Sequence, residues 1–598
     1  MIELSKNLFL YQDTCHVYVV KNGTKAVLID FGSGEVLDRL TEIGVDQVCA
    51  VLMTHHHRDQ GQGLARASEA GIPIWVPHTE QELFSNIDAH WQAREVFNNY
   101  NVRQDRYSLL EQVAIAGALK DYESYEFAGY GFKVVPTPGH TIGSVSFLAW
   151  IDGRHVAFTG DLIAGPGKMW SLAATQWSYN GGEGLPATVA SLLDLQERAP
   201  DWLLPSHGER MERPSEAIGI LITRLQELMQ YRQQNPRLLL LREQPFEEVT
   251  PHLLRSRMSM SNYYVLLSKS GKALFFDFGY DFLTGIPVGS DRASRRPWLY
   301  TLATLKKQYG ITQVDAVVPT HYHDDHVAGI NLLRDNEGTK VWASETFADV
   351  LRQPSYYDLP CLWFDAIPVD RELSIGASIQ WEEYEFTLHP LPGHTLYAVA
   401  ISLMVDDKHV LVSGDQYQGG EGLLWNYVYQ NRFRIQDYVD SAALYETLHP
   451  DVILTGHWEP LWVQPGYFAE LAARGNALER LHRELLPLNE VDFGAEGIGG
   501  RLSPYQTHTQ VGEKFTMQVE VKNPFAREAL AEVRLVVPPG WRADPEQASL
   551  QLAAKATETI EFCVTPSGPP VRRARVAVEL TVEGRRFGQQ AEALVTVQ

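Results

Sequence analysis

The sequence predicts an α/β protein made of two copies of one unit, followed by an antiparallel β-sandwich. Three observations support this prediction. A polar cluster that follows an apolar run occurs twice, further short motifs recur downstream of it in the same order, and alternating apolar and polar residues dominate from about residue 500. The first two indicate a duplicated α/β unit, and the third indicates a separate all-β region.

Each copy contains an apolar run that leads directly into histidines and carboxylates. The runs are residues 50–53 and 316–319, and the clusters are THHHRDQ at 54–60 and THYHDDH at 320–326. Apolar runs of this length predict buried strands, so the clusters should lie on the loops that leave the strands' C-terminal ends, where α/β sheets bind ligands. Imidazole and carboxylate without thiolate suit zinc, iron or manganese.

Three more motifs follow each cluster in the same order. They are PGHT at 138–141 and 392–395, TGD at 159–161 and SGD at 413–415, and SHG at 206–208 and GHW at 456–458. The interval from His140 to Asp161 is 161 − 140 = 21 residues, and the interval from His394 to Asp415 is 415 − 394 = 21 residues. The shared order and the identical spacing indicate a tandem duplication.

This set of motifs resembles the metallo-β-lactamase superfamily of metallohydrolases, over about residues 1–235 and 245–490. The resemblance implies an αββα sandwich in each copy, with metal ions in a groove at one edge of the two sheets. It also implies a set of metal ligands. In the second copy these would be His321, His323 and His394 for the first metal, Asp325, His326 and His457 for the second, and Asp415 bridging both.

The first copy departs from the family pattern at one ligand position. Its matching residues are His55, His57 and His140 for the first metal, Asp59, Gln60 and His207 for the second, and the bridging Asp161. Gln60 stands where a histidine is expected, and its amide oxygen is a weaker donor for zinc than imidazole. We therefore expect two Zn ions (or Mn or Fe) in the second copy and one or two divalent metals in the first. The first copy is read as a one-metal enzyme, an altered two-metal enzyme or a non-catalytic half of an internal pseudo-dimer.

The metal ligands predict a hydrolase that acts on a small-molecule ester, lactone or thioester. Bound metals lower the pKa of water from 15.7 toward neutral, so that hydroxide is present at working pH. The resemblance gives Asp325, and Asp59 in the first copy, the catalytic role of orienting this nucleophile and moving its proton. One alternative is a phosphodiesterase or sulfatase. Another is an oxygenase similar to persulfide dioxygenases, with one iron on His55, His140 and Asp161.

Net charge and cysteine content indicate which binding partners are disfavoured and in which cellular compartment the protein is expected. The net charge of −23 opposes binding to polyanions, which disfavours a nucleic-acid substrate. The four cysteines are scattered and indicate a reducing compartment. Neither a secretory signal nor a run of about 20 apolar residues is visible, so we expect a cytoplasmic protein without membrane contact. A small-molecule substrate is expected, and a homo-oligomer is left open.

We predict domains at residues 1–240, 241–495 and 500–598. Apolar residues at helical spacing predict a helix over 217–229, ended before Asn235-Pro236, and a second over 467–486, ended by Pro487. Alternation predicts strands at 515–521, 531–535 and 576–582. The C-terminal region resembles the immunoglobulin-like accessory domains of bacterial enzymes.

Several features near the predicted grooves remain open at this stage. An insertion around residues 280–298 of the second copy is a candidate lid over the second site. Trp170 and Trp425 follow the bridging aspartates closely, and each either lines a substrate wall or anchors its loop. Tyr417 is read as a core or rim residue rather than a substrate ligand. The repeated triplet Asp-Phe-Gly at 30–32 and 277–279 is expected to end a strand with a turn beneath the metal groove.

Overall fold

The computed structural model describes residues 1–93, 107–177, 184–231, 242–281 and 292–598. The chain divides into two compact units. The first unit comprises Met1–Pro245, Arg257–Met260 and Tyr280–Gly310, and the second comprises Phe246–Ser256, Ser261–Gly279 and Ile311–Gln598. The first unit therefore extends past the predicted boundary between residues 240 and 241, as far as Pro245, and also includes Arg257–Met260 and Tyr280–Gly310 from the predicted second domain.

In the first unit, two sheets pack face to face. The first sheet has the order β1 (Ile2–Ser5), β2 (Leu8–Gln12), β3 (His16–Asn22), β4 (Lys25–Ile29), β5 (Gln47–Leu52), β6 (Ile74–Pro77) and β7 (Gly117–Leu119). The second has the order β12 (Trp202–Pro205), β11 (Arg154–Gly160), β10 (Val145–Ile151), β9 (Tyr130–Pro136) and β8 (Ser124–Phe127). Side chains of both sheets, such as Tyr18, Ile29, Phe147 and Phe158, share one apolar core.

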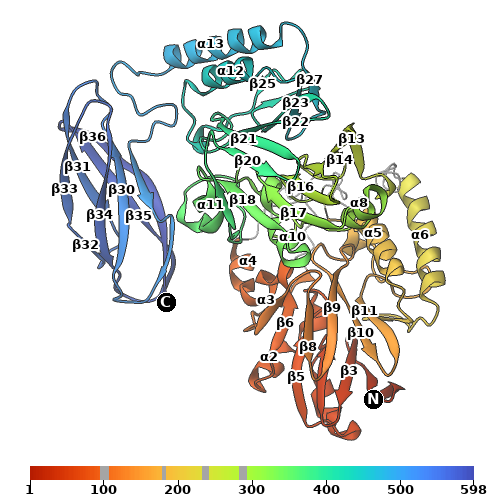
Figure 1. The fold of residues 1–598 in the computed structure, drawn as a ribbon. Coiled ribbons are helices and arrows are strands. Elements are labelled where there is room, and N and C mark those ends of the chain that lie inside the picture. Colours follow the sequence, from red (N-terminus) through yellow and green to blue (C-terminus); the bar gives the residue numbers. More distant parts are fainter. Residues whose placement is uncertain (94–106, 178–183, 232–241, 282–291) are drawn as a thin grey trace. The chain divides into compact units, whose positions relative to one another are not determined.

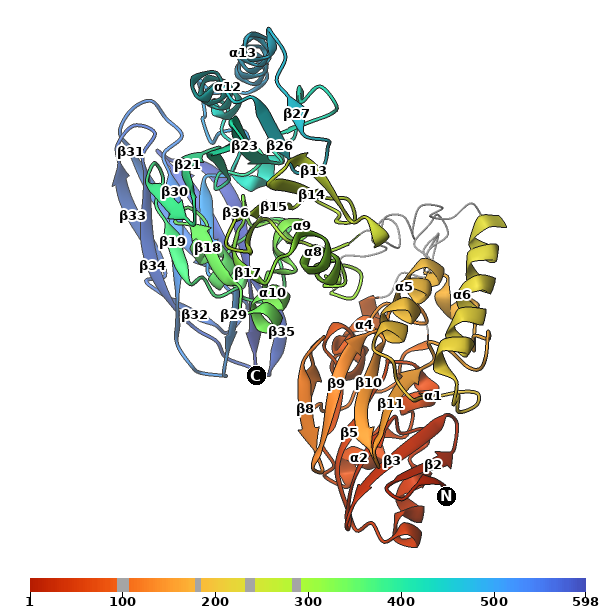
Figure 2. The ribbon, with the colours of Figure 1, turned by 45° about the vertical axis from the view of Figure 1, so that its right-hand side comes forward.

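Helices cover the outer faces of these sheets. The first unit contains α1 (Arg58–Gly61), α2 (Leu64–Glu69), α3 (Glu82–Ser85), α4 (Ile87–Ala93), α5 (Gly184–Glu197), α6 (Pro214–Tyr231) and α8 (Thr301–Tyr309). Leu64 of α2 and Phe84 of α3 pack on the first sheet, and α5 and α6 lie along the second (Figures 1 and 2). The result is the predicted αββα sandwich, and α6 confirms the helix expected over 217–229.

The second repeat forms the same architecture in the second unit. One sheet has the order β13 (Phe246–Thr250), β14 (Leu253–Ser256), β15 (Tyr264–Leu267), β16 (Lys272–Phe276), β17 (Gln313–Val318), β18 (Lys340–Ser344) and β19 (Arg371–Leu373). The other has the order β20 (Ser378–Trp381), β21 (Tyr384–Pro390), β22 (Val399–Val405), β23 (Lys408–Gly414), β26 (Val452–Thr455) and β27 (Leu461–Trp462). A two-stranded ribbon of β24 (Tyr417–Gln418) and β25 (Leu424–Trp425) follows β23.

Its helices follow the same plan. They are α9 (Asp324–Val327), α10 (Ile330–Glu337), α11 (Ala348–Arg352), α12 (Asp437–Leu448) and α13 (Tyr467–Leu485). Tyr445 of α12 and Leu471 of α13 pack with Leu411 and Ile453 of the second sheet. The α13 bounds confirm the helix predicted over 467–486, which ends before Pro487 because proline lacks the N–H that would continue the helix.

The pairing of parallel strands is repeated and explains where the motifs come together. Strands β4 and β5 run parallel, as do β16 and β17, and the His-rich clusters follow β5 and β17. Strands β11 and β12 are parallel with Gly160 opposite Pro205, and β23 and β26 are parallel with Gly414 opposite Thr455. The aspartates Asp161 and Asp415 and the closing histidines His207 and His457 therefore leave neighbouring strands at one sheet edge.

The C-terminal residues form a β-sandwich. One sheet has the order β28 (Gly500–Ser503), β30 (Phe515–Lys522), β34 (Thr557–Thr565) and β32 (Arg542–Asp544). The other has the order β29 (Gln506–Thr509), β36 (Arg585–Val597), β35 (Val571–Val582), β31 (Ala529–Val536) and β33 (Gln547–Leu552). Both contribute to one core that includes Val519, Phe562, Val533 and Val578. The pairs are antiparallel as predicted, except that β29 runs parallel to β36. The likeness to immunoglobulin domains stays a prediction.

Two further expectations can be compared with the described residues. Cys15, Cys49, Cys361 and Cys563 form no disulfide. Among the described residues, no helix is both long enough and apolar enough to cross a bilayer. Of the predicted lid, residues 282–291 lie outside the described residues, and residues 292–298 belong to the first unit rather than to the unit that contains the second site.

Candidate metal centres

An aspartate at the end of an early strand anchors each His-rich loop. Asp30 follows β4 and Asp277 follows β16, both with left-handed φ angles of 57° and 63°. The backbone N of Thr54 donates to Asp30 Oδ1 at 2.8 Å, and that of Thr320 donates to Asp277 Oδ1 at 2.7 Å. The repeated triplets therefore lie beneath the grooves, as predicted, and also hold the residue that precedes the first histidine.

Three buried histidines converge in each repeat. They are His55, His57 and His140 in the first repeat and His321, His323 and His394 in the second. In each repeat, Nε2 of the PGHT histidine lies 2.9 Å from Nδ1 of the middle histidine of this group. Burial, together with the neighbouring imidazoles, lowers the pKa of His55 and of His323 to about 3. The rings are thus neutral at pH 7 and present lone pairs, as metal ligands must.

Unpartnered nitrogens support a metal at these points. Nε2 of His55 and Nε2 of His321 are buried without a hydrogen-bond partner in the structure. A buried polar atom without a partner is costly, so such atoms call for an explanation. A divalent ion bound by three imidazoles fits the arrangement, because His₃ sets are established zinc ligands.

The second repeat has a second cluster beside the first. His457 Nε2 lies 3.0 Å from Asp415 Oδ2 and 3.3 Å from Asp325 Oδ2, and His326 Nε2 lies 3.3 Å from Asp415 Oδ1. Asp415 Oδ2 also lies 3.5 Å from His394 Nε2 of the three-histidine group. Asp415 therefore stands between the two clusters, where a bridging ligand must stand.

Charge balance in this cluster is consistent with a cation. Burial opposes charged imidazoles, but Asp325, Asp277 and Asp415 together raise the pKa of His326 well above its usual value. Against the same effect of burial, Asp415 and Asp325 raise the pKa of His457 to about 10. Without a metal, protons on these rings neutralise the carboxylates. A bound divalent ion would replace those protons, since metal binding releases protons from its ligands.

His326 also has a supporting carboxylate. Its Nδ1 lies 2.9 Å from Asp277 Oδ2, which leaves Nε2 directed at the cluster. Such a carboxylate behind a ligating histidine fixes the ring and raises its basicity. Asp277 was not among the predicted site residues, although the duplicated Asp-Phe-Gly triplet marks its position in the sequence.

The corresponding cluster of the first repeat is arranged differently. Gln60 Nε2 donates to Asp161 Oδ2 at 3.0 Å, and His207 Nδ1 lies 2.9 Å from Asp161 Oδ1. The opposite nitrogen of His207 donates to the carbonyl of Thr14 at 3.0 Å and lies 3.4 Å from Asp59 Oδ2. The predicted residues do meet here, but no single nitrogen of His207 faces both carboxylates. Among the described residues, these side chains do not present ligand atoms to one point.

Without a metal, a protonated His207 balances the charge of this cluster in the first repeat. Although burial opposes it, the hydrogen bond and the charge of Asp161 raise the pKa of His207 to about 9. Burial also opposes the charge on Asp161, yet His140 and His207 lower the pKa of Asp161 to about 2. The ring of Trp170 stacks on His207 with centroids 4.1 Å apart and planes 3° apart. An imidazolium and an amide N–H thus balance the Asp161 carboxylate.

An open pocket of about 280 Å³ leads to the first repeat's histidines. Its lining residues are His57, Arg58, Asp59, Gln62, Tyr107, His140, Trp170, Ser171 and Ala174. Trp170, of which 53% is exposed, forms part of its wall. Trp425 instead pairs with Tyr417 in the β24–β25 ribbon and packs on the apolar core. Tyr417 is 3% exposed and accepts from Ser441 Oγ at 3.2 Å, which confirms it as a core residue.

Glu80 is a second residue that sequence reasoning missed. It accepts from the backbone N of His56 at 3.0 Å, from Thr141 Oγ1 at 2.6 Å and from the backbone N of Gly143 at 3.0 Å. It therefore connects the loop of His55 and His57 to the loop of His140. Glu80 stands 24 positions after His56 and belongs to no recognisable motif, so nothing in the sequence indicated this role.

The fold and the site together define a duplicated αββα protein with metal-binding residues at one sheet edge. A model of the metallo-beta-lactamase superfamily matches residues 10–207 and again residues 260–457, together more than half of the chain. The chain belongs to the metallo-β-lactamase superfamily and carries two copies of its domain.

Similar proteins include named hydrolases. A hydroxyacylglutathione hydrolase of Albidiferax ferrireducens is 26% identical over 191 residues, which is 31% of this chain and 58% of that protein. A probable metallo-hydrolase of Streptococcus pyogenes is 28% identical over 152 residues, 25% of this chain and 61% of that protein. This chain thus spans little more than half the length of these two relatives. A metallo-beta-lactamase family protein of Thermus thermophilus shares 19% identity over 38% of this chain and 82% of its own, with a TM-score of 0.31.

Proposed function

We propose that this protein is a metal-dependent hydrolase of a small-molecule thioester, ester or lactone, with its catalytic centre in the second repeat. The observation that carries the proposal is the position of Asp415, within 3.5 Å of His394 in one cluster and 3.0 Å of His457 in the other. When bound, two divalent ions would polarise the substrate carbonyl and lower the pKa of water.

Asp325 is the residue that we assign to proton transfer. Its side chain is 18% exposed and lies 3.3 Å from His457 Nε2. Burial opposes its charge, but His326 and His457 lower its pKa, so the carboxylate is available as a proton acceptor at pH 7. In this position it can hold a water molecule through one oxygen and pass the proton to a leaving thiolate or alkoxide.

A hydrogen-bonded frame orients the ligands around it. Asn431 Nδ2 lies 3.1 Å from His323 Nε2, and Tyr322 donates to Asn431 Oδ1 at 2.7 Å. His394 Nδ1 donates to the carbonyl of Asn426 at 2.6 Å. The His394 contact leaves the lone pair of Nε2 directed at the cluster, as a metal ligand requires, and the Asn431 contact holds the His323 ring with Nδ1 facing the cluster.

The thioester is the substrate that we place first. The net charge of −23 disfavours a polyanionic substrate, and several relatives are named hydroxyacylglutathione hydrolase. The test is turnover by the zinc-loaded protein of an acylglutathione, a lactone, a p-nitrophenyl ester, a phosphodiester and a sulfate ester. We expect kcat/KM to be highest on the thioester. Higher values on the phosphodiester or the sulfate ester would refute this assignment.

We further propose that the first repeat binds one metal, because Gln60 replaces an imidazole in its second cluster and His207 turns different nitrogens to Asp161 and Asp59. This site offers a second candidate activity. Asp161 Oδ2 lies 3.4 Å from His140 Nε2 and 3.7 Å from His55 Nε2, which is the composition of a two-histidine, one-carboxylate iron site. Iron in the purified protein, with oxygen consumption on a persulfide that is lost in His55→Ala, would support an oxygenase. Zinc at this site without oxygen consumption would exclude it.

A further inference from the structure

The loop that carries His140 in the first repeat is held by contacts on two sides. We call residues 140–144 the His140 loop. On one side is Glu80, whose Oε1 accepts from Thr141 Oγ1 and from the backbone N of Gly143. The side chain of Glu80 is only 1% exposed, so these charge-assisted hydrogen bonds form away from solvent.

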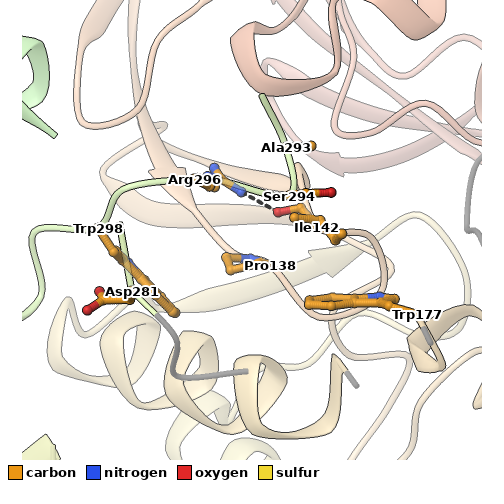
Figure 3. A pocket seen from close by; sticks show the side chains of 8 residues that line it. All are labelled: Pro138, Ile142, Trp177, Asp281, Ala293, Ser294, Arg296 and Trp298. Atoms are coloured by element: carbon orange, nitrogen blue, oxygen red, sulfur yellow. Dashed lines mark hydrogen bonds between the residues drawn. The ribbon is translucent and has the colours of Figure 1, made fainter. Parts of the chain in front are cut away.

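On the other side is Arg296. Its Nη1 donates to the carbonyl of Ile142 at 2.8 Å and to that of Ser144 at 3.1 Å. Two other nitrogens of the guanidinium donate to Asp121, Nε to Oδ2 at 2.8 Å and Nη2 to Oδ1 at 2.6 Å. Figure 3 shows Arg296 beside the loop, with a dashed line to Ile142. Both side chains are under 10% exposed, so neither charge is solvated well by water.

Arg296 comes from an unexpected part of the sequence. It lies between β16 and β17 of the second repeat, within the insertion predicted to cover the second site. In space it belongs to the compact unit of the first repeat. The first repeat's metal loop is therefore completed by a residue encoded after the second repeat has begun.

The second repeat supports its matching loop differently. The backbone N of His394 donates to Gln416 Oε1 at 3.2 Å, and the backbone N of Leu396 donates to the carbonyl of Asn431. Gln416 and Asn431 come from the same repeat as the loop. A substitution of Arg296 should therefore weaken metal binding in the first repeat more than in the second.

We propose that Arg296 is a positioning residue for the first metal centre, and that with Glu80 it clamps the His140 loop so that His140 meets His55 and His57. Four polar groups of the loop are tied to two buried charges, and His140 directly precedes them in the chain. Supporting contacts of this kind are worth about 10–100-fold in metal affinity. The inference rests on the proposed one-metal site of the first repeat.

The choice of substitution follows from the surroundings. Arg296 lines a small pocket of about 40 Å³ with Pro138 and Trp298, so alanine would also leave a cavity. Arg296→Met keeps most of the volume and removes the donors. Arg296→Lys keeps a charge that can reach a carbonyl or Asp121. The matched control is Arg198→Met, because Arg198 pairs with Asp194 at 3.1 Å in the same unit.

The test uses the full chain with the second repeat's sites disabled by His321→Ala and Asp415→Ala. Metal-free protein is titrated with cobalt(II), and both the dissociation constant and the visible spectrum are recorded. We expect Arg296→Met to weaken cobalt binding about 10–100-fold and to alter the spectrum, Arg296→Lys to recover part of the loss, and Arg198→Met to bind like its parent. Thermal unfolding of the metal-free proteins reports stability separately.

Three results would overturn the proposal. Cobalt affinity of Arg296→Met within twofold of the parent would do so. A lowered unfolding temperature with unchanged cobalt affinity and spectrum would show a structural role alone. A parent protein that binds no cobalt would refute the one-metal site itself, and the clamp with it. If Arg296→Met does not fold, Glu80→Gln is judged by the same criterion, and Arg296→Lys must bind cobalt more weakly than the parent.

Discussion

Exchanging Gln60 and His326 between the repeats should move one metal site from one repeat to the other. The described residues contain three sets of converging ligands, one in the first repeat and two in the second. We therefore expect 1 + 2 = 3 metals per chain in the wild type. Gln60→His should add one, because position 60 would then supply the missing imidazole, and His326→Gln should remove one.

The structure also indicates how much the carboxylate behind the histidine contributes to the affinity for the added metal. In the second repeat, Asp277 Oδ2 lies 2.9 Å from His326 Nδ1. The equivalent Asp30 is in place but accepts from Ser206 Oγ at 2.5 Å, and its burial without a cationic partner raises its pKa to about 7. A histidine at position 60 would meet this carboxyl. The double variant Gln60→His/Asp30→Asn should then bind the added metal about 10–100-fold more weakly, or about 1.4–2.7 kcal/mol.

The assay is zinc titration by calorimetry, with elemental analysis after removal of unbound metal. His207 must turn one nitrogen toward the new site, so the added metal should bind more weakly than those already present. Four metals in the wild type would refute our account of the first repeat. So would three in Gln60→His, because the missing imidazole would then not be what excludes the fourth.

Three further outcomes are expected. Asp325→Asn should lower kcat/KM by at least about 100-fold, whereas Asp59→Asn should change it only a few-fold, since general acid–base residues contribute about 10²–10⁴; the reverse order in steady-state assays would place catalysis in the first repeat. His457 has its folded pKa raised to about 10, so in metal-free protein its stabilising charge is fully present below about pH 6.5 and is lost as the pH rises to 10. The urea concentration at the midpoint of unfolding should therefore fall between about pH 6.5 and pH 10, and the fall should be smaller in His457→Gln. Trp170→Leu should lower the pKa of His207 by about half a unit, read by NMR, because the stacked ring stabilises the imidazolium; an unchanged pKa would show that Asp161, Asp59 and the Thr14 carbonyl hold the charge without the ring.

The repeated motifs were sufficient to predict the fold and both three-histidine groups. Each motif follows the corresponding strand in both repeats, so its place in the sequence determines which sheet edge it reaches. The His-rich clusters, the aspartates and the closing histidines leave strands of parallel pairs, whereas the PGHT histidines follow the antiparallel strands β9 and β21. The strand expected before the triplet at 30–32 and the predicted strand at 50–53 form β4 and β5, and their counterparts form β16 and β17. Gln60 was also recognised from sequence as a departure, since one aligned position had changed type.

The supporting residues could not be predicted in the same way. Asp277 orients His326 from the end of β16, 49 residues earlier in the chain, and Glu80 and Arg296 reach the His140 loop from separate parts of the chain. Their roles depend on side-chain geometry across loops that do not repeat. The predicted lid stays a prediction, because residues 282–291 lie outside the described residues, but the described part of the insertion groups with the first unit, which the sequence did not indicate.

The sequence by itself determined the duplication and the ligand types, because repeated local motifs carry that information, and its resemblance to the family implied the two αββα sandwiches. Only the tertiary structure decided that His207 turns opposite nitrogens to Asp161 and Asp59, and that Arg296 serves the first centre. A ligand's identity is a property of its residue, whereas the direction of its lone pair depends on every group packed around it.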